Sequence, residues 1–525
     1  MELYWTGYSM MLTRRHRHSI GVWTEWDSRA LSGTGAGQSE RLAREGLARL
    51  VTFLVEGAAQ RGDIKFHFVV DADFHKPIHA MLSNLRAREG VDWVIQSNFA
   101  DHPSEPPVVA QERVQVLARE ARNRFFQFLY EPNRLRRIAQ VGQRLFRFLF
   151  EPNRLGRIRR KYANLVSVQQ PLPPTPSASS RVTNYTSLVD FANAEVEVDG
   201  WLLWMPNLIN GLRLKGRRVA LFPDALPVDF GASYPPGFFS DWFDKVRYTL
   251  PDLDNIITFS RHVATRHVHD HFGVDLARIV VVKHAPVDLR EDLPVLATDR
   301  KRTPSSQKYA ADVLRQHALN REWKYLFGFP FEDVNYVAIS TQDRPTKNLP
   351  LAVEAVRLLN RRDYAGVKLF TTALVQEGGV GCLLPNALRE ARLMLDFVSM
   401  PDLPKAQHAA FYHCAAVTVV PSLLEGGDTV YPFSESVSVG TPCLMARGPH
   451  TEELLESYPE LEPWVFDPYD ADGLAKLIRE TIVDRDRILA IQLASFERMQ
   501  RRTWADVAGE YADVVVGGVK YAVPR

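Results

Sequence analysis

Short apolar runs alternate with longer stretches of mixed polarity along most of this chain. An apolar run of about 4–8 residues between turn residues is typical of a strand buried on both faces of a sheet. Before residue 290, such runs occupy residues 20–23, 66–70, 93–96, 219–222, 255–260 and 279–282. After residue 330, they occupy residues 335–340, 367–372, 397–400, 417–420, 442–445 and 465–467.

The stretches between these runs often place their apolar residues at helical spacing, as in residues 39–56, 348–361 and 472–483. Strands that alternate with helices predict parallel sheets covered by helices on both faces. We therefore predict the α/β class, with two Rossmann-like, doubly wound parallel-sheet domains. A length of 525 residues agrees with two large domains, at about 100–200 residues per domain.

Changes in composition divide the chain. We predict a first Rossmann-like domain over residues 1–290, a polar hinge over 291–334 and a second such domain over 335–484. The final helices, in residues 485–525, should cross back to the first domain. Within the first domain, residues 105–182 break the alternation with a basic helical insertion that ends in a Pro- and Ser-rich connector.

The composition is that of a soluble globular protein, with 46% hydrophobic and 24% charged residues. The formal net charge of +2 does not indicate an oppositely charged partner for the whole molecule. The three cysteines lack metal-ligand spacing and fit a reducing compartment, so we expect a cytoplasmic protein without a metal site. No apolar run predicts a membrane span, and the N-terminus lacks the pattern of a signal peptide.

Residues 121–162 carry a repeat with a period of 20, RFFQFLYEPNRLRRI followed by RLFRFLFEPNRLGRI. The segment holds twelve basic and two acidic residues, and its Phe and Leu side chains recur at helical spacing. A basic helix with an aromatic stripe suits an anionic membrane surface, which would make the protein peripheral on the inner face of a membrane. The alternative is a local duplication packed on its own domain with solvated arginines. Nucleic acid is not expected, because no nucleic-acid-binding fold accompanies the charge.

One stretch combines the parts of a phosphate-binding site. The apolar run at 417–420 is followed by two adjacent glycines, Gly426 and Gly427, and then by a short predicted helix over 433–439. A strand, a glycine loop and a helix N-terminus form a nucleotide-phosphate site in a parallel sheet. Glu435 falls in the first turns of this helix, where we expect its carboxylate to face the crevice and accept hydrogen bonds from a ribose.

This stretch resembles the donor-site signature of retaining glycosyltransferases of family four, whose two Rossmann-like domains form the fold called GT-B. The matching positions are Pro421-Ser422, Glu425-Gly426, Pro432, Glu435 and Gly440-Thr441-Pro442. Nine residues separate the two glutamates here, whereas the family has seven, so a loop insertion of two residues is the simplest interpretation. The resemblance implies that Glu435 holds the ribose and that Glu425 either contacts the sugar or orients the loop.

The resemblance extends into the first domain. The run IITFSRHVATRHVHDHFGVDLARIVVVKHAPVD is similar to the last strand, helix and strand of the family's first domain. An earlier strand of that domain usually ends in His-Asp, and this histidine contacts the transferred sugar. Pro223-Asp224 stands at that place here, so Asp224 is the candidate substitute, and a turn cap is the alternative role.

A pair of cations follows the first apolar run of the second domain. Arg344 and Lys347 match the family's arginine and lysine that bind the donor diphosphate. A guanidinium forks to two phosphate oxygens and an ammonium adds a point charge, so this pair suits a diphosphate. The alternative is two solvated charges after a strand.

The resemblance implies transfer of a sugar from a nucleotide-sugar donor to a glycan or lipid-linked acceptor, as in polysaccharide biosynthesis. It also implies retention of anomeric configuration without a metal ion or a cofactor. The predicted catalytic residues are Glu425 and Asp224. The predicted donor-binding residues are Arg344, Lys347, Gly426, Gly427, Tyr431, Phe433, Ser434 and Glu435. The predicted acceptor-side residues are Gly35, Gly37 and His284. The alternative is a catalytically silent relative that binds a nucleotide-sugar or a partner, which the missing histidine and the altered glutamate spacing would favour.

Overall fold

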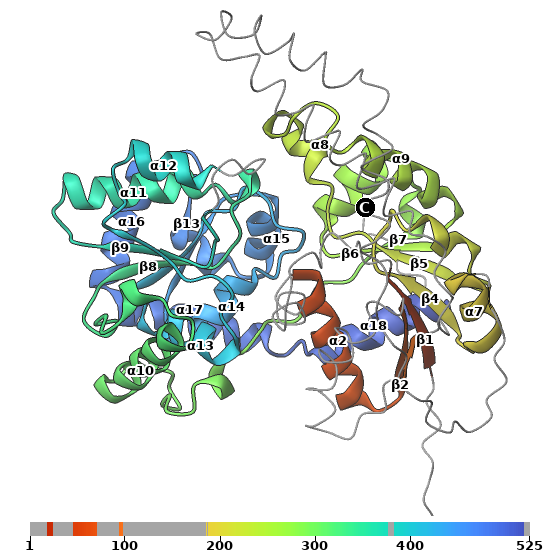
Figure 1. Ribbon diagram of the computed structural model, residues 1–525, viewed down its shortest axis with the longest axis horizontal. Helices are drawn as coiled ribbons and strands as arrows, with labels where there is room; N and C mark the ends of the chain where they lie inside the picture. The colour runs from red at the N-terminus through yellow and green to blue at the C-terminus, as the bar shows by residue number, and fades with distance from the viewer. Residues whose placement is uncertain are drawn as a thin grey trace, which may run out of the picture. The chain divides into compact units, whose positions relative to one another are not determined.

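The computed structural model describes residues 18–24, 46–70, 94–97, 185, 187–375 and 383–518 (Figure 1). The predicted insertion at 105–182, its repeat at 121–162 and the candidate residues Gly35 and Gly37 lie outside the described residues. None of the described helices is long and apolar enough to span a membrane.

The first sheet has seven parallel strands in the order β3-β2-β1-β4-β5-β6-β7. The strands are β1 (His18–Trp23), β2 (Ile64–Val70), β3 (Val94–Ser97), β4 (Gly200–Leu203), β5 (Arg218–Leu221), β6 (Asn255–Thr258) and β7 (Ile279–Val281). On the inner strand β1, Val22 pairs with Phe68 of β2 and with Leu202 of β4. All three side chains are buried, as expected for a parallel sheet covered on both faces.

Strand β4 is absent from the predicted runs because its sequence, GWLL, is short and begins with a glycine. The structure explains this glycine. A Cβ at Gly200 would lie 2.6 Å from the carbonyl oxygen of Val515, so only glycine allows helix α18 (Trp504–Val516) to pack this closely on the strand. The contact depends on residues more than 300 positions apart, which no local pattern reveals.

The second sheet has six parallel strands in the order β10-β9-β8-β11-β12-β13. The strands are β8 (Tyr336–Ile339), β9 (Lys368–Thr371), β10 (Phe397–Ser399), β11 (Val417–Val420), β12 (Cys443–Ala446) and β13 (Val465–Phe466). In chain order this is the 3-2-1-4-5-6 arrangement of a Rossmann sheet, in which ligands bind beyond the carboxyl ends of the strands where the order reverses. The predicted fold class, two Rossmann-like doubly wound domains, is confirmed.

The helices fill the connections between strands. In the first part of the chain they are α2 (Gly46–Arg61), α7 (Leu188–Glu195), α8 (Leu226–Phe230), α9 (Ser240–Thr249) and the π-helix η5 (Val263–His271). After β7 they are α10 (Pro304–Asn320), α11 (Leu349–Arg361), α12 (Leu384–Glu390), α13 (Lys405–Cys414), α14 (Tyr431–Ser438), α15 (Pro449–Ser457), α16 (Ala471–Val483), α17 (Arg485–Met499) and α18.

Helix α10 lies within residues 291–334, where the sequence predicted a polar hinge. Thr303 and Ser306 form a capping box at its start, and Pro304 is its first residue. Its Ala311 and Leu314 are buried in a core shared with α13, so this segment packs as part of the fold. The prediction missed it because many exposed polar residues surround a narrow apolar stripe.

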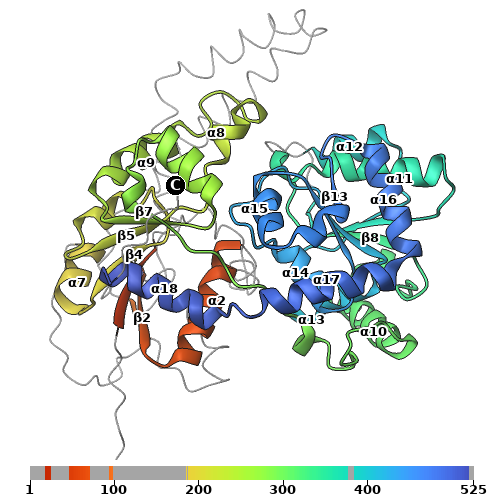
Figure 2. The same cartoon turned by 180° about the vertical axis from the view of Figure 1, so that it is seen from behind.

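The last two helices pack on different sheets. Helix α17 lies against α14 of the second sheet, and Figure 2 shows α18 beside α2 of the first. The packing of α18 on α2 is close, because a Cβ at Gly57 would lie 2.0 Å from the carbonyl oxygen of Trp504. The chain therefore passes from one sheet to the other between Met499 and Trp504.

Candidate functional site

The glycine loop after β11 touches strand ends of the first sheet. A Cβ at Gly426 would lie 2.6 Å from the carbonyl oxygen of Pro223, which follows β5. A Cβ at Gly427 would lie 3.1 Å from the Cβ of Phe259, which follows β6. Only glycine permits the approach to another backbone at 426, and a Cβ at 427 would be crowded by the Phe259 side chain. The carboxyl ends of strands from both sheets therefore meet at this loop.

Lys347 and Glu425 form an ion pair at this meeting point. Lys347 ends the short 3₁₀-helix η9 (Pro345–Lys347) after β8, and its Nζ lies 2.6 Å from Oε1 of Glu425. Burial opposes ionisation of Glu425, but the Lys347 ammonium outweighs it and holds the pKa of this carboxyl below its usual value. The amide of Leu423 donates to the carbonyl of Thr346 at 2.8 Å, which fixes the two loops together.

Asn348 provides the turn that directs η9 towards this loop. Its backbone is left-handed, with φ of 47°, a conformation that asparagine tolerates better than most residues. The Asn348 side chain also donates a hydrogen bond to the carbonyl of Pro468 at 2.8 Å. The turn thus holds the cation loop at the end of β8, where α11 begins.

Asp224 and Arg344 complete a group of two carboxylates and two cations. Burial raises the pKa of Asp224, and this effect exceeds the opposing effects of His267, Lys347 and Arg344. Both cations therefore act electrostatically on this carboxyl. Arg344 is exposed and makes no ion pair with any described residue. Four of the residues selected from sequence therefore come together from the loops after β5, β8 and β11.

Glu435 was expected to face the crevice, but its side chain is fully buried in α14. The guanidinium of Arg49, on α2, donates to Oε1 of Glu435, and the hydroxyl of Tyr412 donates to Oε2 at 3.0 Å. The guanidinium also lies over the rings of Phe53 and Tyr431, at 5.6 and 5.5 Å from their centroids. Both carboxylate oxygens of Glu435 therefore have partners within the protein.

Other candidate residues around α14 pack between the two sheets. His284 follows β7, and its Nδ1 lies 2.7 Å from the hydroxyl of Tyr431, while its Nε2 lies 3.3 Å from that of Tyr511. Burial lowers the pKa of His284 to about 3, so its ring is neutral. Ser434 accepts from the amide of Val287 at 3.1 Å.

Phe433, the remaining candidate on α14, is 1% exposed. Together with His284 and Ser434, it lines the pocket described below. The candidate residues Gly35 and Gly37 belong to the part of the chain that the structure does not describe.

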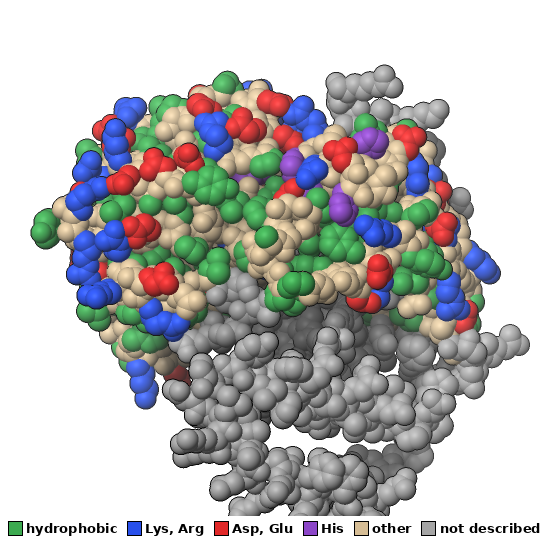
Figure 3. All heavy atoms as spheres, turned by 90° about the horizontal axis from the view of Figure 1, so that it is seen from above, with side chains coloured by type: hydrophobic (Ala, Val, Ile, Leu, Met, Phe, Trp, Pro, Cys, Tyr) green, Lys and Arg blue, Asp and Glu red, His purple; other side chains and the backbone are tan. Residues whose placement is uncertain are grey.

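A histidine–aspartate group supports the loop after β5 and was not selected from the sequence. The amide of Ala225 donates to Nδ1 of His267 at 3.0 Å, so Nε2 of this buried ring carries the proton and donates to Oδ2 of Asp229 at 2.7 Å. Nε2 of His262 lies 3.3 Å from the same oxygen. Histidine side chains lie beside acidic and basic ones on the face in Figure 3.

The three side chains have the spacing of a cation site. However, the Nε2 proton leaves His267 without a lone pair on the side that faces Asp229, because its other nitrogen already accepts an amide proton. We therefore interpret the group as a hydrogen-bonded support for Asp224 and its neighbours.

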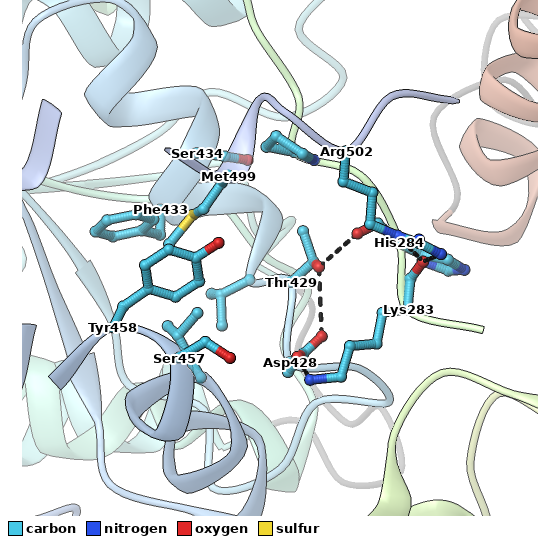
Figure 4. A pocket seen from close by; sticks show the side chains of 13 residues that line it. Lys283, His284, Asp428, Thr429, Phe433, Ser434, Ser457, Tyr458, Met499 and Arg502 are labelled. Atoms are coloured by element: carbon cyan, nitrogen blue, oxygen red, sulfur yellow. Dashed lines mark hydrogen bonds and ion pairs between the residues drawn. The ribbon is translucent and has the colours of Figure 1, made fainter. Parts of the chain in front are cut away.

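A pocket in the described part of the chain is lined by Asp428 and Thr429, which follow the glycine loop, and by residues after β7 such as Lys283 (Figure 4). Nζ of Lys283 lies 2.5 Å from Oδ2 of Asp428 there, and Thr429 donates to the carbonyl of His284 at 2.9 Å. Its charged groups are thus paired within the protein. The pocket adjoins the site without including its cations.

No protein-family model and no curated protein matches this sequence. The structure is similar to that of Anabaena Alr3699/HepE in complex with UDP-glucose, with 12% identity and a TM-score of 0.53, over 96% of this chain and 100% of that chain. It is also similar to the N-terminal domain of Candida albicans trehalose-6-phosphate phosphatase, with 10% identity and a TM-score of 0.52, over 98% of this chain and 99% of that one. At such low identity the likeness shows the fold alone, which is the GT-B arrangement of two Rossmann-like domains.

Proposed function

We propose that this protein is a glycosyltransferase that moves a sugar from a nucleotide-sugar donor to a glycan or lipid-linked acceptor, with retention of anomeric configuration. The observation that carries the proposal is the Lys347–Glu425 ion pair, held beside Arg344 and Asp224 at the strand ends of two Rossmann-like sheets. Ligands bind at this end of such sheets. A protein with the same fold, from Anabaena, was crystallised with UDP-glucose.

Each residue has a role that its geometry supports. Arg344 and Lys347 bind the diphosphate and stabilise its charge as it leaves, assisted by the amides of the glycine loop. Glu425 orients Lys347 through their 2.6 Å contact and offers its second oxygen to the sugar. Asp224 approaches the sugar from the first sheet. For Glu435 to accept hydrogen bonds from a ribose, Arg49 must first move away from it.

A panel of nucleotide-sugars, screened by thermal shift and followed by mass spectrometry of the products, tests the proposal. We expect one donor to raise the melting temperature, and the same donor to yield a glycosylated product or, without acceptor, slow hydrolysis. A protein that binds a donor but neither transfers nor hydrolyses it would be the catalytically silent relative. A protein that binds no member of the panel would contradict donor recognition itself.

Activity is expected to persist fully in excess EDTA. The two cations in the 344–347 loop supply the positive charge that a divalent ion supplies to a leaving diphosphate in other enzymes. The measurement compares initial rates in EDTA, in buffer alone and with added Mg²⁺. Strict dependence on the added ion would contradict the roles assigned to Arg344 and Lys347.

The basic repeat at 121–162 predicts binding to anionic membrane surfaces, which would bring the enzyme to a lipid-linked acceptor. Each Lys or Arg near such a surface contributes about 1 kcal/mol, which salt screens. The protein should co-sediment with anionic vesicles at low salt, less so as salt rises, and not with neutral vesicles. Deleting 121–162 should abolish co-sedimentation and leave nucleotide binding intact. Failure of the whole protein to bind anionic vesicles at low salt would rule out the membrane role and leave packing within its own domain or docking of another protein.

A further inference from the structure

His450 is a buried histidine whose ring has no hydrogen-bond partner among the described residues. It is the second residue of α15, 1% of it is exposed, and neither Nδ1 nor Nε2 is bonded. Leaving a buried polar group unpaired lowers stability, so such a group in a folded protein requires an explanation.

Two other buried histidines in the described part of the chain, His267 and His413, have partners for both ring nitrogens. Both ring nitrogens of His267 are bonded, to Ala225 and to Asp229. In His413, Nδ1 lies 2.7 Å from the carbonyl of Val439 and Nε2 lies 2.9 Å from Oγ of Ser306. His450 differs from these two histidines, because neither of its ring nitrogens has a hydrogen-bond partner among the residues that the structure describes.

The surroundings of His450 are those of the candidate site. Glu425 and Lys347 both act electrostatically on its ring, as does His262 from the first sheet. Gly448 lies against the ring, because a Cβ there would be 3.0 Å from Cε1 of His450 and 2.7 Å from the carbonyl oxygen of Leu423. This close packing fixes the ring beside the loop that carries Glu425.

The protonation state of the ring indicates what it can bind. Burial lowers the pKa of His450 to about 4, so the ring is neutral and offers one N–H donor and one acceptor nitrogen. Phosphate oxygens accept hydrogen bonds but do not donate them, whereas a sugar hydroxyl does both. The buried hydroxyl of Thr346, next to Lys347, also lacks a partner among the described side chains and has the same dual character.

We propose that His450 binds hydroxyl groups of the transferred sugar, on the side of the site formed by the second sheet. This inference rests on the proposed function, since it names a contact within the same donor site. Glu425 and His450 then hold the sugar together, and Arg344 and Lys347 hold the diphosphate. The discrimination between a nucleotide-sugar and the bare nucleoside diphosphate depends on His450.

The test measures two affinities by calorimetry. UDP with UDP-glucose, GDP with GDP-mannose and ADP with ADP-glucose are titrated into the wild-type protein, and the tightest pair is used for the variants. His450→Leu should bind the diphosphate within about twofold of wild type and should lose about tenfold in affinity for the nucleotide-sugar, the worth of about one hydrogen bond. His450→Gln, which keeps a donor and an acceptor, should retain part of the preference.

Thermal unfolding separates this role from a structural one. The melting temperature of His450→Leu should equal or exceed that of wild type, because an unpaired polar group is removed. His413→Leu is the matched control, since it removes a bonded histidine: its melting temperature should fall while its ratio of affinities stays that of wild type. His450→Phe, which keeps a ring, repeats the measurement if the leucine variant fails to fold.

Each outcome decides one point. If the wild-type protein binds none of the pairs, the proposed function fails and this inference fails with it. If the wild-type protein binds a pair and the apolar His450 variants keep the same ratio of affinities, only the inference is overturned. An equal loss of affinity for both ligands also overturns it, because the histidine would then act on the diphosphate or on the fold.

Discussion

Replacing Glu435 with leucine is expected to lower the free energy of unfolding by about 3 kcal/mol, because it breaks a buried ion pair from one side. The Glu435 carboxylate is fully buried, whereas 25% of the Arg49 side chain is exposed. The leucine leaves the Arg49 guanidinium and the Tyr412 hydroxyl without their acceptor. Urea unfolding of wild type and variant measures the difference.

A double-mutant cycle provides the control. Arg49→Met removes the other partner, and the double variant should recover part of the stability that Glu435→Leu loses, because no charge is then left unpaired. Additive effects of the two substitutions would show that the ion pair does not couple α2 to α14.

The same pair predicts how stability depends on pH. Burial opposes ionisation of Glu435, but Arg49 and Tyr412 outweigh it and lower the pKa of this carboxyl. A carboxyl with a lower pKa in the folded state stabilises the protein above its unfolded pKa of about 4.3 and loses this contribution as the pH falls through the folded value. The stability difference between wild type and Glu435→Leu should therefore be full at pH 7 and shrink at acid pH.

Local pattern was sufficient for most of the sheet framework. Residues 417–420 were predicted as a strand and form β11, because a run of β-branched residues between polar turns leaves few alternatives. The loop after β11 was also predicted, from the adjacent Gly426 and Gly427. Asp224, Arg344, Lys347 and Glu425 lie in the loops that follow β5, β8 and β11, and parallel strands end on one edge of their sheet, so the sequence could predict this placement.

Contacts between residues far apart in the chain determine the features of the site that the local sequence pattern does not predict. Glu435 has the sequence context of a crevice residue, yet its partner Arg49 lies 386 positions away in the chain. His450 sits in an ordinary helix start, and only the fold shows that its ring is buried beside Glu425 without a partner. The glycines at 200 and 426 have the same explanation, since distant backbone atoms determine that no side chain fits there.

Removing the Lys347 ammonium is expected to weaken binding of a nucleoside diphosphate more than any other single change in the site. A charge-assisted contact with phosphate contributes about 1.5–3 kcal/mol, and Lys347→Ala also leaves the Glu425 carboxylate unpaired beside the ligand's negative charge. Arg344→Ala should cost more than about 1 kcal/mol of binding free energy. This loss should be smaller than that of Lys347→Ala, because, among the described residues, Arg344 is not paired with a carboxylate that its removal would leave unpaired. Adding Glu425→Gln to Lys347→Ala should restore part of the affinity, because it removes the repulsion.

Calorimetric titration of the preferred nucleoside diphosphate into wild type, Arg344→Ala and Lys347→Ala tests the central claim most directly. The account predicts weaker binding in both variants, with the larger loss for Lys347→Ala, while both proteins unfold cooperatively. Unchanged affinity in both variants would contradict the claim that the loops after β8 and β11 form the donor site.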